Sequence, residues 1–121
     1  MADGIKGWAR LLRATKVSYW GLGWAIREEE AFRIEAALCL LLVPAALWLG
    51  ETGLERAIMV MSLFFVLIIE LLNTAVEVVV DRIGIERHVL SGRAKDLGSA
   101  AVHLSLVQVP VVWSLVYFGR T

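Results

Sequence analysis

Hydrophobic residues form three long runs along the chain, separated by short polar segments. The runs predict membrane-spanning helices over about residues 32–49, 55–80 and 97–118, because about 20 predominantly apolar residues are needed to cross the hydrocarbon core. The first run is short when it is counted from Ala36, and it reaches spanning length only when it is extended back to residue 32. The pattern therefore predicts an all-α membrane protein.

A different pattern precedes the first run, at about residues 5–24. Apolar and basic residues fall on opposite faces of a helix there: Ile5, Trp8, Leu12 and Tyr19 on one face, and Lys6, Arg10 and Arg13 on the other. A basic, Trp-rich amphipathic helix suits the plane of an anionic membrane surface. We therefore expect a single membrane domain over residues 1–121, with one surface helix followed by three spans.

Four polar residues interrupt the second run, and their spacing is helical. Glu70, Asn73, Glu77 and Asp81 fall within an arc of about 80° on a helix, so their side chains share one face. We call these four residues the polar stripe. Carboxyls at membrane depth are costly and usually functional, although interhelical hydrogen bonding or an ion path would also explain the stripe.

Composition supports a membrane location and excludes some functions. Hydrophobic residues make up 59% of the 121 residues, and the net charge is zero. Binding to nucleic acid requires a strong basic excess, so nucleic acid is not expected as a partner. Because Cys39 is the only cysteine, the chain cannot form an intrachain disulfide.

The distribution of basic residues predicts the orientation in the membrane. The first 35 residues hold six Lys or Arg and residues 81–96 hold four, whereas the first connection has only Arg56 and the tail only Arg120. By the positive-inside rule, the N-terminus and the segment 81–96 are cytoplasmic. The polar stripe then meets the cytoplasm at its Asp81 end.

Carboxylates near the expected cytoplasmic boundary are suited to magnesium. Glu77 together with one of Glu28, Glu29 or Glu30 could hold Mg²⁺, which is typically bound by one or two carboxylates plus substrate phosphates. Basic residues that could pair with such phosphates are Lys95, Arg93 and Arg10.

Glu70 lies two helical turns deeper than Glu77, or about 10 Å along the axis. A buried carboxylate there could take a proton from an alcohol within the membrane. Asn73 lies between the two acids and could orient either one. The difference in depth therefore predicts two binding positions. A nucleotide would bind near the membrane interface, and a hydroxyl acceptor would bind slightly deeper in the membrane.

Common phosphotransferase motifs are missing. The sequence has neither a GxxxxGK[ST] loop nor the motifs of protein kinases. His88 and His103 have no second His or Cys at ligand spacing, and a serine in a helix more often bonds a backbone carbonyl than acts as a nucleophile. The residues alone indicate a cytoplasm-facing membrane enzyme or an ion pathway.

Three segments carry a specific resemblance: 70–77 (ELLNTAVE), 80–84 (VDRIG) and 90–101 (LSGRAKDLGSAA). With Arg10, Glu29, the 31–33 segment AFR and Glu35, they resemble the bacterial integral-membrane diacylglycerol kinase family. The resemblance covers essentially the whole chain. It implies a homotrimer in the bacterial cytoplasmic (inner) membrane, with active sites shared between subunits. It also implies transfer of the ATP γ-phosphate to diacylglycerol, with Mg²⁺ as cofactor.

The resemblance also implies roles for single residues. Glu70 matches the catalytic base, Glu29 and Glu77 match the metal-binding pair, and the other catalytic positions are Asn73, Lys95 and Asp96. Nucleotide positions, besides Glu29, Glu77, Lys95 and Asp96, are Arg10, Ser18, Glu86 and His88. Positions near the lipid substrate, besides Arg10 and Glu70, are Arg33, Glu35, Ser99 and Trp113.

The chain departs from the family pattern at a few positions. Glu28 and Glu30 flank Glu29 where uncharged residues are more usual, and Val17 stands where an aromatic residue is expected. An undecaprenol kinase of the same family is the nearest alternative, although the Trp-rich surface helix favours a glycerolipid. A small proton or cation channel built on the polar stripe is an alternative of a different class.

Overall fold

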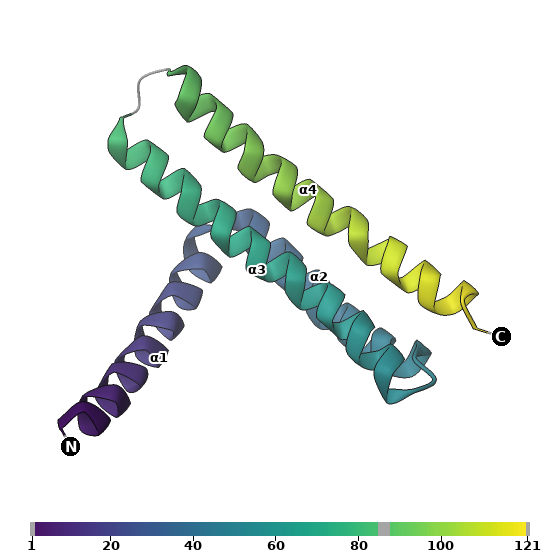
Figure 1. The fold of residues 1–121 in the computed structure, drawn as a ribbon. Coiled ribbons are helices and arrows are strands. Elements are labelled where there is room, and N and C mark those ends of the chain that lie inside the picture. The colour runs from purple at the N-terminus through teal and green to yellow at the C-terminus, as the bar shows by residue number, and fades with distance from the viewer. Residues whose placement is uncertain (1, 85–87, 121) are drawn as a thin grey trace. The chain divides into compact units, whose positions relative to one another are not determined.

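The computed structural model describes residues 2–84 and 88–120, with side chains from residue 6 onward. Four helices occupy these ranges: α1 (Ala2–Glu28), α2 (Glu30–Leu49), α3 (Gly53–Ile83) and α4 (Val89–Phe118) (Figure 1). The prediction of an all-helical chain is therefore confirmed. The expected number of spans is also confirmed, because three helices, α2, α3 and α4, are each long and apolar enough to cross a membrane.

The chain divides into two compact units, residues 1–34 and residues 35–121. In the first unit, Glu29 is the single residue between α1 and α2. Its N–H donates to the Ala25 carbonyl at 2.9 Å, and its own carbonyl accepts from the Arg33 N–H at 3.1 Å. The Arg33 guanidinium donates to the carbonyls of Ile26 and Arg27 at 3.1 and 2.8 Å. Arg33 therefore satisfies carbonyls that the end of α1 leaves free.

In the second unit, α3 and α4 run antiparallel and pack against each other (Figure 1). Sequence signals set the start of both helices. Thr52 caps α3, since its hydroxyl accepts from the Glu55 N–H at 3.1 Å, while the Glu55 carboxylate accepts from the Glu51 N–H at 2.9 Å. The pattern differs from a capping box in that Glu55 accepts from the residue before the N-cap rather than from Thr52 itself. His88 caps α4, because its Nδ1 accepts from the Leu90 N–H at 3.1 Å.

Polar side chains join α3 to α4 in the middle of their interface. Gln108 donates to the carbonyls of Ser62 and Ser105 at 2.8 and 2.9 Å, and the Trp113 indole donates to the Ser62 hydroxyl at 2.9 Å. Ser62 and Ser105 are both buried. Because each donor needs its acceptor opposite, these bonds fix how far one helix is shifted along the other.

Arg120 joins the end of α4 to the turn between α2 and α3. Its guanidinium donates to the Leu49 carbonyl at 2.7 Å and pairs with Glu55 at 2.8 Å and Glu51 at 3.3 Å. The hydrogen bond that Arg120 donates to Glu55 raises the pKa of the guanidinium, which therefore stays charged at every ordinary pH.

We predict that Gln108→Leu destabilises the protein by about 1 kcal/mol, the upper part of the range for an interhelical hydrogen bond in a membrane. The substitution keeps an apolar side chain of similar size but removes the donor to Ser62. Reversible unfolding in mixed detergent micelles measures the change. Val107→Leu, at an exposed position of α4, is the control. Equal stability of Gln108→Leu and the unsubstituted protein would show that the bond contributes nothing.

Candidate functional site

The polar stripe runs along α3 from a buried position to an exposed one. Glu70 is 5% exposed, Asn73 and Glu77 are half-buried, and Asp81 is exposed. Burial thus decreases steadily toward the end of α3 that leads into the α3–α4 connection. The helix carries one acid in an apolar environment and two acids closer to water.

Asn73 packs directly onto the backbone of α4. A Cβ added at Gly98 would overlap Asn73 Oδ1 and would lie 3.2 Å from Asn73 Cγ, so only glycine leaves room for the carboxamide. Asn73 Nδ2 lies 3.4 Å from Glu77 Oε1, a long hydrogen bond. The Asn73 Oδ1 atom is buried without a hydrogen-bond partner in the described chain. This oxygen faces the Gly98 backbone, whereas the amide nitrogen faces Glu77.

Lys95 of α4 faces the exposed end of the stripe. Its Nζ lies 2.7 Å from Asp81 Oδ1, and Glu77 is near enough to act on its charge. The side chains of Lys95 and Asp81 are 44% and 57% exposed. An ion pair with this exposure contributes little to stability, so Lys95 can exchange Asp81 for another anion at small cost.

Glu35 of α2 approaches the buried end of the stripe. Its carboxyl is near enough to the Glu70 carboxyl for the two charges to act on each other. Oε2 of each residue is buried and has no hydrogen-bond partner among the described residues. One acid from α2 and one from α3 therefore lie in the buried part of the site with an unpartnered oxygen each.

The structure thus brings five of the predicted site residues into one line within the second unit: Glu35, Glu70, Asn73, Glu77 and Lys95. Two further residues lie in the same region, although the sequence analysis assigned neither an individual role. Asp81 is the partner of Lys95, and Gly98 makes room for Asn73. The signal for Gly98 was a glycine inside a helix, which often marks a close approach.

Other predicted residues lie elsewhere in the second unit. Asp96 and Ser99 are exposed on α4, and the indole of Trp113 bonds to Ser62 rather than approaching Glu70. His88 caps α4, and Glu86 lies outside the described residues.

The remaining predicted residues belong to the first unit. Arg10 is exposed on α1, the Ser18 hydroxyl donates to the Ala14 carbonyl at 2.8 Å, and Arg33 caps the end of α1. Glu29 is the junction between α1 and α2, whereas the exposed Glu28 is the last residue of α1 and the exposed Glu30 is the first residue of α2. Of these three acids, Glu29 is therefore the one that lies between the helices rather than within one of them.

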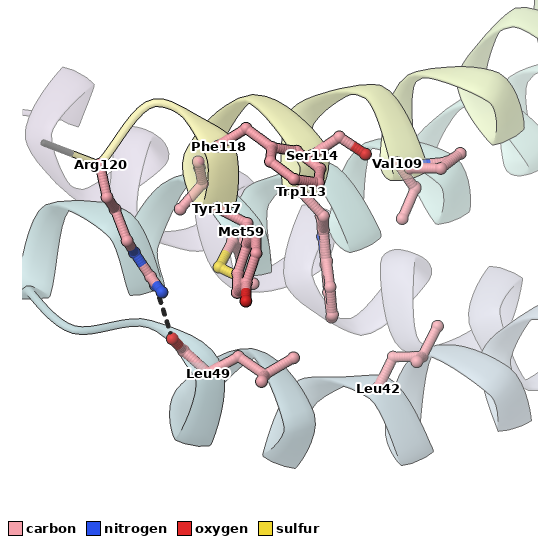
Figure 2. Close-up of a pocket in the computed structure, with 11 residues that line it drawn as sticks. Leu42, Leu49, Met59, Val109, Trp113, Ser114, Tyr117, Phe118 and Arg120 are labelled. Atoms are coloured by element: carbon pink, nitrogen blue, oxygen red, sulfur yellow. Dashed lines mark hydrogen bonds between the residues drawn. The ribbon is translucent and has the colours of Figure 1, made fainter.

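Cavities of the second unit lie at both ends of the α3–α4 pair. Figure 2 shows one of about 550 Å³ beside Arg120, with Leu42, Met59, Trp113 and Tyr117 among its mostly apolar lining. It contains no residue of the polar stripe. A second cavity, of about 450 Å³, lies at the α3–α4 connection, and its lining includes Val80, His88 and Ser91.

The donor set on α3 fits magnesium. The described residues contain no cluster of three or more His, Cys, Asp or Glu side chains that could hold a metal by themselves. Mg²⁺ needs fewer, since one or two carboxylates with substrate phosphates and water complete its six oxygen ligands. The half-buried Glu77 carboxylate is a hard oxygen donor of this kind.

Comparison with known proteins identifies the family of the chain. Residues 16–117 match the family model described as prokaryotic diacylglycerol kinase. Diacylglycerol kinase from Haemophilus influenzae is 50% identical over 112 residues, covering 93% of this chain and 95% of that protein. The Escherichia coli enzyme is 43% identical over 99% of this chain and 98% of its own length, and the Pseudomonas aeruginosa enzyme is 43% identical over 96% and 94%. The chain is thus a membrane protein that belongs to the prokaryotic diacylglycerol kinase family.

Proposed function

We propose that the protein transfers the γ-phosphate of ATP to the hydroxyl of diacylglycerol, giving phosphatidic acid at the cytoplasmic face of the bacterial inner membrane. The observation that carries the proposal is the graded burial of the polar stripe, with a buried acid at one end and exposed charges at the other. A lipid hydroxyl and a nucleotide need these two environments side by side. The names of the relatives favour diacylglycerol over undecaprenol as the acceptor.

In this proposal Glu70 is the general base. It accepts the proton of the lipid hydroxyl, whose oxygen attacks the γ-phosphorus. The bond from that phosphorus to the bridging oxygen breaks, and ADP leaves with the electron pair. Burial of Glu70 keeps bulk water from the attacking position, which favours the lipid over hydrolysis.

Glu77 and Glu29 hold magnesium in this proposal, with Asn73 beside Glu77. The bound ion would neutralise charge on the phosphates. Asn73 orients Glu77 through its Nδ2 contact, and Lys95 exchanges Asp81 for a phosphate oxygen. The roles of Arg10, Ser18, Glu86 and His88 near the nucleotide stay predictions.

A homotrimer with shared sites would complete this arrangement. Asp96 and Ser99 lie exposed on α4 among large apolar side chains, and neither side chain makes a hydrogen bond within the described part of the chain. Polar groups on a membrane helix need protein or water rather than lipid around them. A neighbouring subunit would supply that cover and would bring its own Glu29, Arg33 or Trp113 toward the site. The basic residues favour a cytoplasmic N-terminus.

Purified protein in mixed micelles tests the function directly. With γ-labelled ATP and Mg²⁺, we expect label in phosphatidic acid when diacylglycerol is present, and much less label when undecaprenol replaces it. Glu70→Gln should lower kcat by about 10²- to 10⁴-fold, the usual contribution of a general base. Labelling of neither lipid, or full turnover by Glu70→Gln, would refute the proposal.

Glu77→Gln should weaken the response to magnesium. The amide retains one oxygen but loses the charge, so we expect half-maximal activity to require about ten times more Mg²⁺. Titration of activity with Mg²⁺ at saturating ATP measures the shift. Glu51→Gln, an acid in the turn between α2 and α3, is the matched control. An unchanged Mg²⁺ titration for Glu77→Gln would remove Glu77 from the metal site.

Gly98→Ala should lower kcat by about tenfold, which corresponds to about 1.4 kcal/mol in the barrier. The added Cβ would displace the Asn73 carboxamide from α4 and disturb its contact with Glu77. Gly53→Ala places a Cβ in open space in α3 and should leave kcat unchanged. Normal turnover by a folded Gly98→Ala protein would show that the position of Asn73 is not critical.

A further inference from the structure

The cavity beside Arg120 lies between α2 and α4, at the end of the helix pair that the polar stripe does not reach (Figure 2). Its volume is about 550 Å³. Met59, which is part of the lining, is about 16 Å from Glu70 along the axis of α3. A molecule bound here is therefore remote from the proposed base.

Contacts on both sides hold this cavity open. On α4 the Trp113 indole is fixed by its bond to Ser62 at 2.9 Å, and Figure 2 shows its ring extending toward Leu42 of α2. At the mouth, Arg120 donates to the Leu49 carbonyl at 2.7 Å and so holds the end of α2. Protein interiors leave few voids larger than a water molecule, so a space of this size between fixed walls needs an occupant.

The lining and the volume exclude two occupants. Arg120 and Ser114 aside, the lining side chains are aliphatic, aromatic or Met, and water needs polar partners that such walls do not offer. One turn of an α-helix, with its diameter of about 10–12 Å and pitch of about 5.4 Å, occupies about 500 Å³. A spanning helix from a second copy would need several times the volume of the cavity, whereas a single hydrocarbon chain fits.

Arg120 makes one end of the cavity polar. Its Nε and Nη2 donate to Glu55, and Nη2 also donates to the Leu49 carbonyl. Its Nη1 has an ion pair with Glu51 at 3.3 Å and makes no hydrogen bond within the described part of the chain, so it can donate to the phosphate of a lipid. The arginine and its two glutamates together carry a net negative charge. This charge opposes an anionic headgroup and favours one that contains an ammonium group.

We propose that the cavity binds one acyl chain of a zwitterionic phospholipid, whose phosphate accepts hydrogen bonds from Arg120 Nη1. The polar end of this lipid lies at Arg120, so it presents no hydroxyl to Glu70. It is a second lipid, distinct from the acceptor of the proposed reaction, and its binding does not depend on the proposed function.

Quenching of Trp113 fluorescence tests this site. Trp8→Phe, Trp20→Phe, Trp24→Phe and Trp48→Phe together leave Trp113 as the reporter. The protein is placed in vesicles of equal parts phosphatidylethanolamine and phosphatidylglycerol, and one of the two lipids at a time carries bromine on its acyl chains. Brominated phosphatidylethanolamine should quench Trp113 about fivefold more strongly than brominated phosphatidylglycerol, the selectivity expected from one charge near a membrane surface.

A reference protein that retains Trp48 in place of Trp113 reports on the surrounding bilayer. Trp48 is 83% exposed near the same end of α2 and lies outside the cavity. We expect both brominated lipids to quench it equally. Equal quenching of Trp113 by the two lipids, or the same selectivity at Trp48, would overturn the proposal.

Filling the cavity tests whether the chain lies inside it. Leu42→Phe combined with Leu49→Phe places larger side chains in the lining and should lower the quenching of Trp113 by brominated phosphatidylethanolamine. Leu40→Phe combined with Leu41→Phe makes the same change at exposed positions outside the lining and should have no effect. Identical quenching in the two double variants would place the lipid chain outside the cavity.

Other occupants give different results. A second copy of the chain seated in the cavity would protect Trp113 from every brominated lipid, and quenching by brominated diacylglycerol alone would assign the cavity to the acceptor. Either result would overturn the proposal. Arg120→Gln should lower the preference for phosphatidylethanolamine, because the donor to the phosphate is lost. If a variant fails to fold by circular dichroism, the comparison of Trp113 with Trp48 still decides.

Discussion

Polar side chains inside an apolar environment need protein partners, and this constraint determines how α3 and α4 fit together. Gln108 and Trp113 find their acceptors at Ser62, near the middle of α3. Such bonds exist at one relative position of the helices, whereas contacts between aliphatic side chains tolerate a shift along the axis. With the register fixed at Ser62, Gly98 lies opposite Asn73 and Lys95 opposite Asp81. The arrangement of the candidate site therefore depends on hydrogen bonds made some distance from it.

The polar groups of α3 and α4 are of two kinds, those with hydrogen-bond partners and those without. Around Ser62 and at Arg120 the donors and acceptors are matched. Along the polar stripe they are not, because Glu70 and Asn73 each retain a buried oxygen without a partner in the described chain, as does Glu35 of α2. An unmatched polar atom costs stability, so its persistence in one region favours a functional origin. Unmet hydrogen-bonding capacity thus separates the candidate site from the structural contacts more clearly than charge does.

Much of the architecture could be predicted from the sequence, because each helix is determined by the pattern of residues within its own segment. Runs of apolar residues indicate α2, α3 and α4, and the spacing of Glu70, Asn73, Glu77 and Asp81 places them on one face. Contacts between helices could not be predicted in this way, since periodicity within one helix contains no information on its register with another. The pairing of Lys95 with Asp81 and the packing of Asn73 onto Gly98 are of this kind. Arg33 illustrates a different limit, because its local role in capping α1 is independent of the role that the resemblance implies.

Gly98 shows how a residue without chemistry of its own can set the chemistry of a site. Its missing side chain lets Asn73 approach the backbone of α4, and that approach leaves the carboxamide near Glu77 with one oxygen unpartnered. A larger residue would strengthen α4 by helix propensity and would still weaken the site. Helix propensity therefore favours a larger residue at position 98, whereas the site requires glycine there. The preference for glycine in the middle of a long membrane helix is best explained by the polar side chain that it admits on the neighbouring helix.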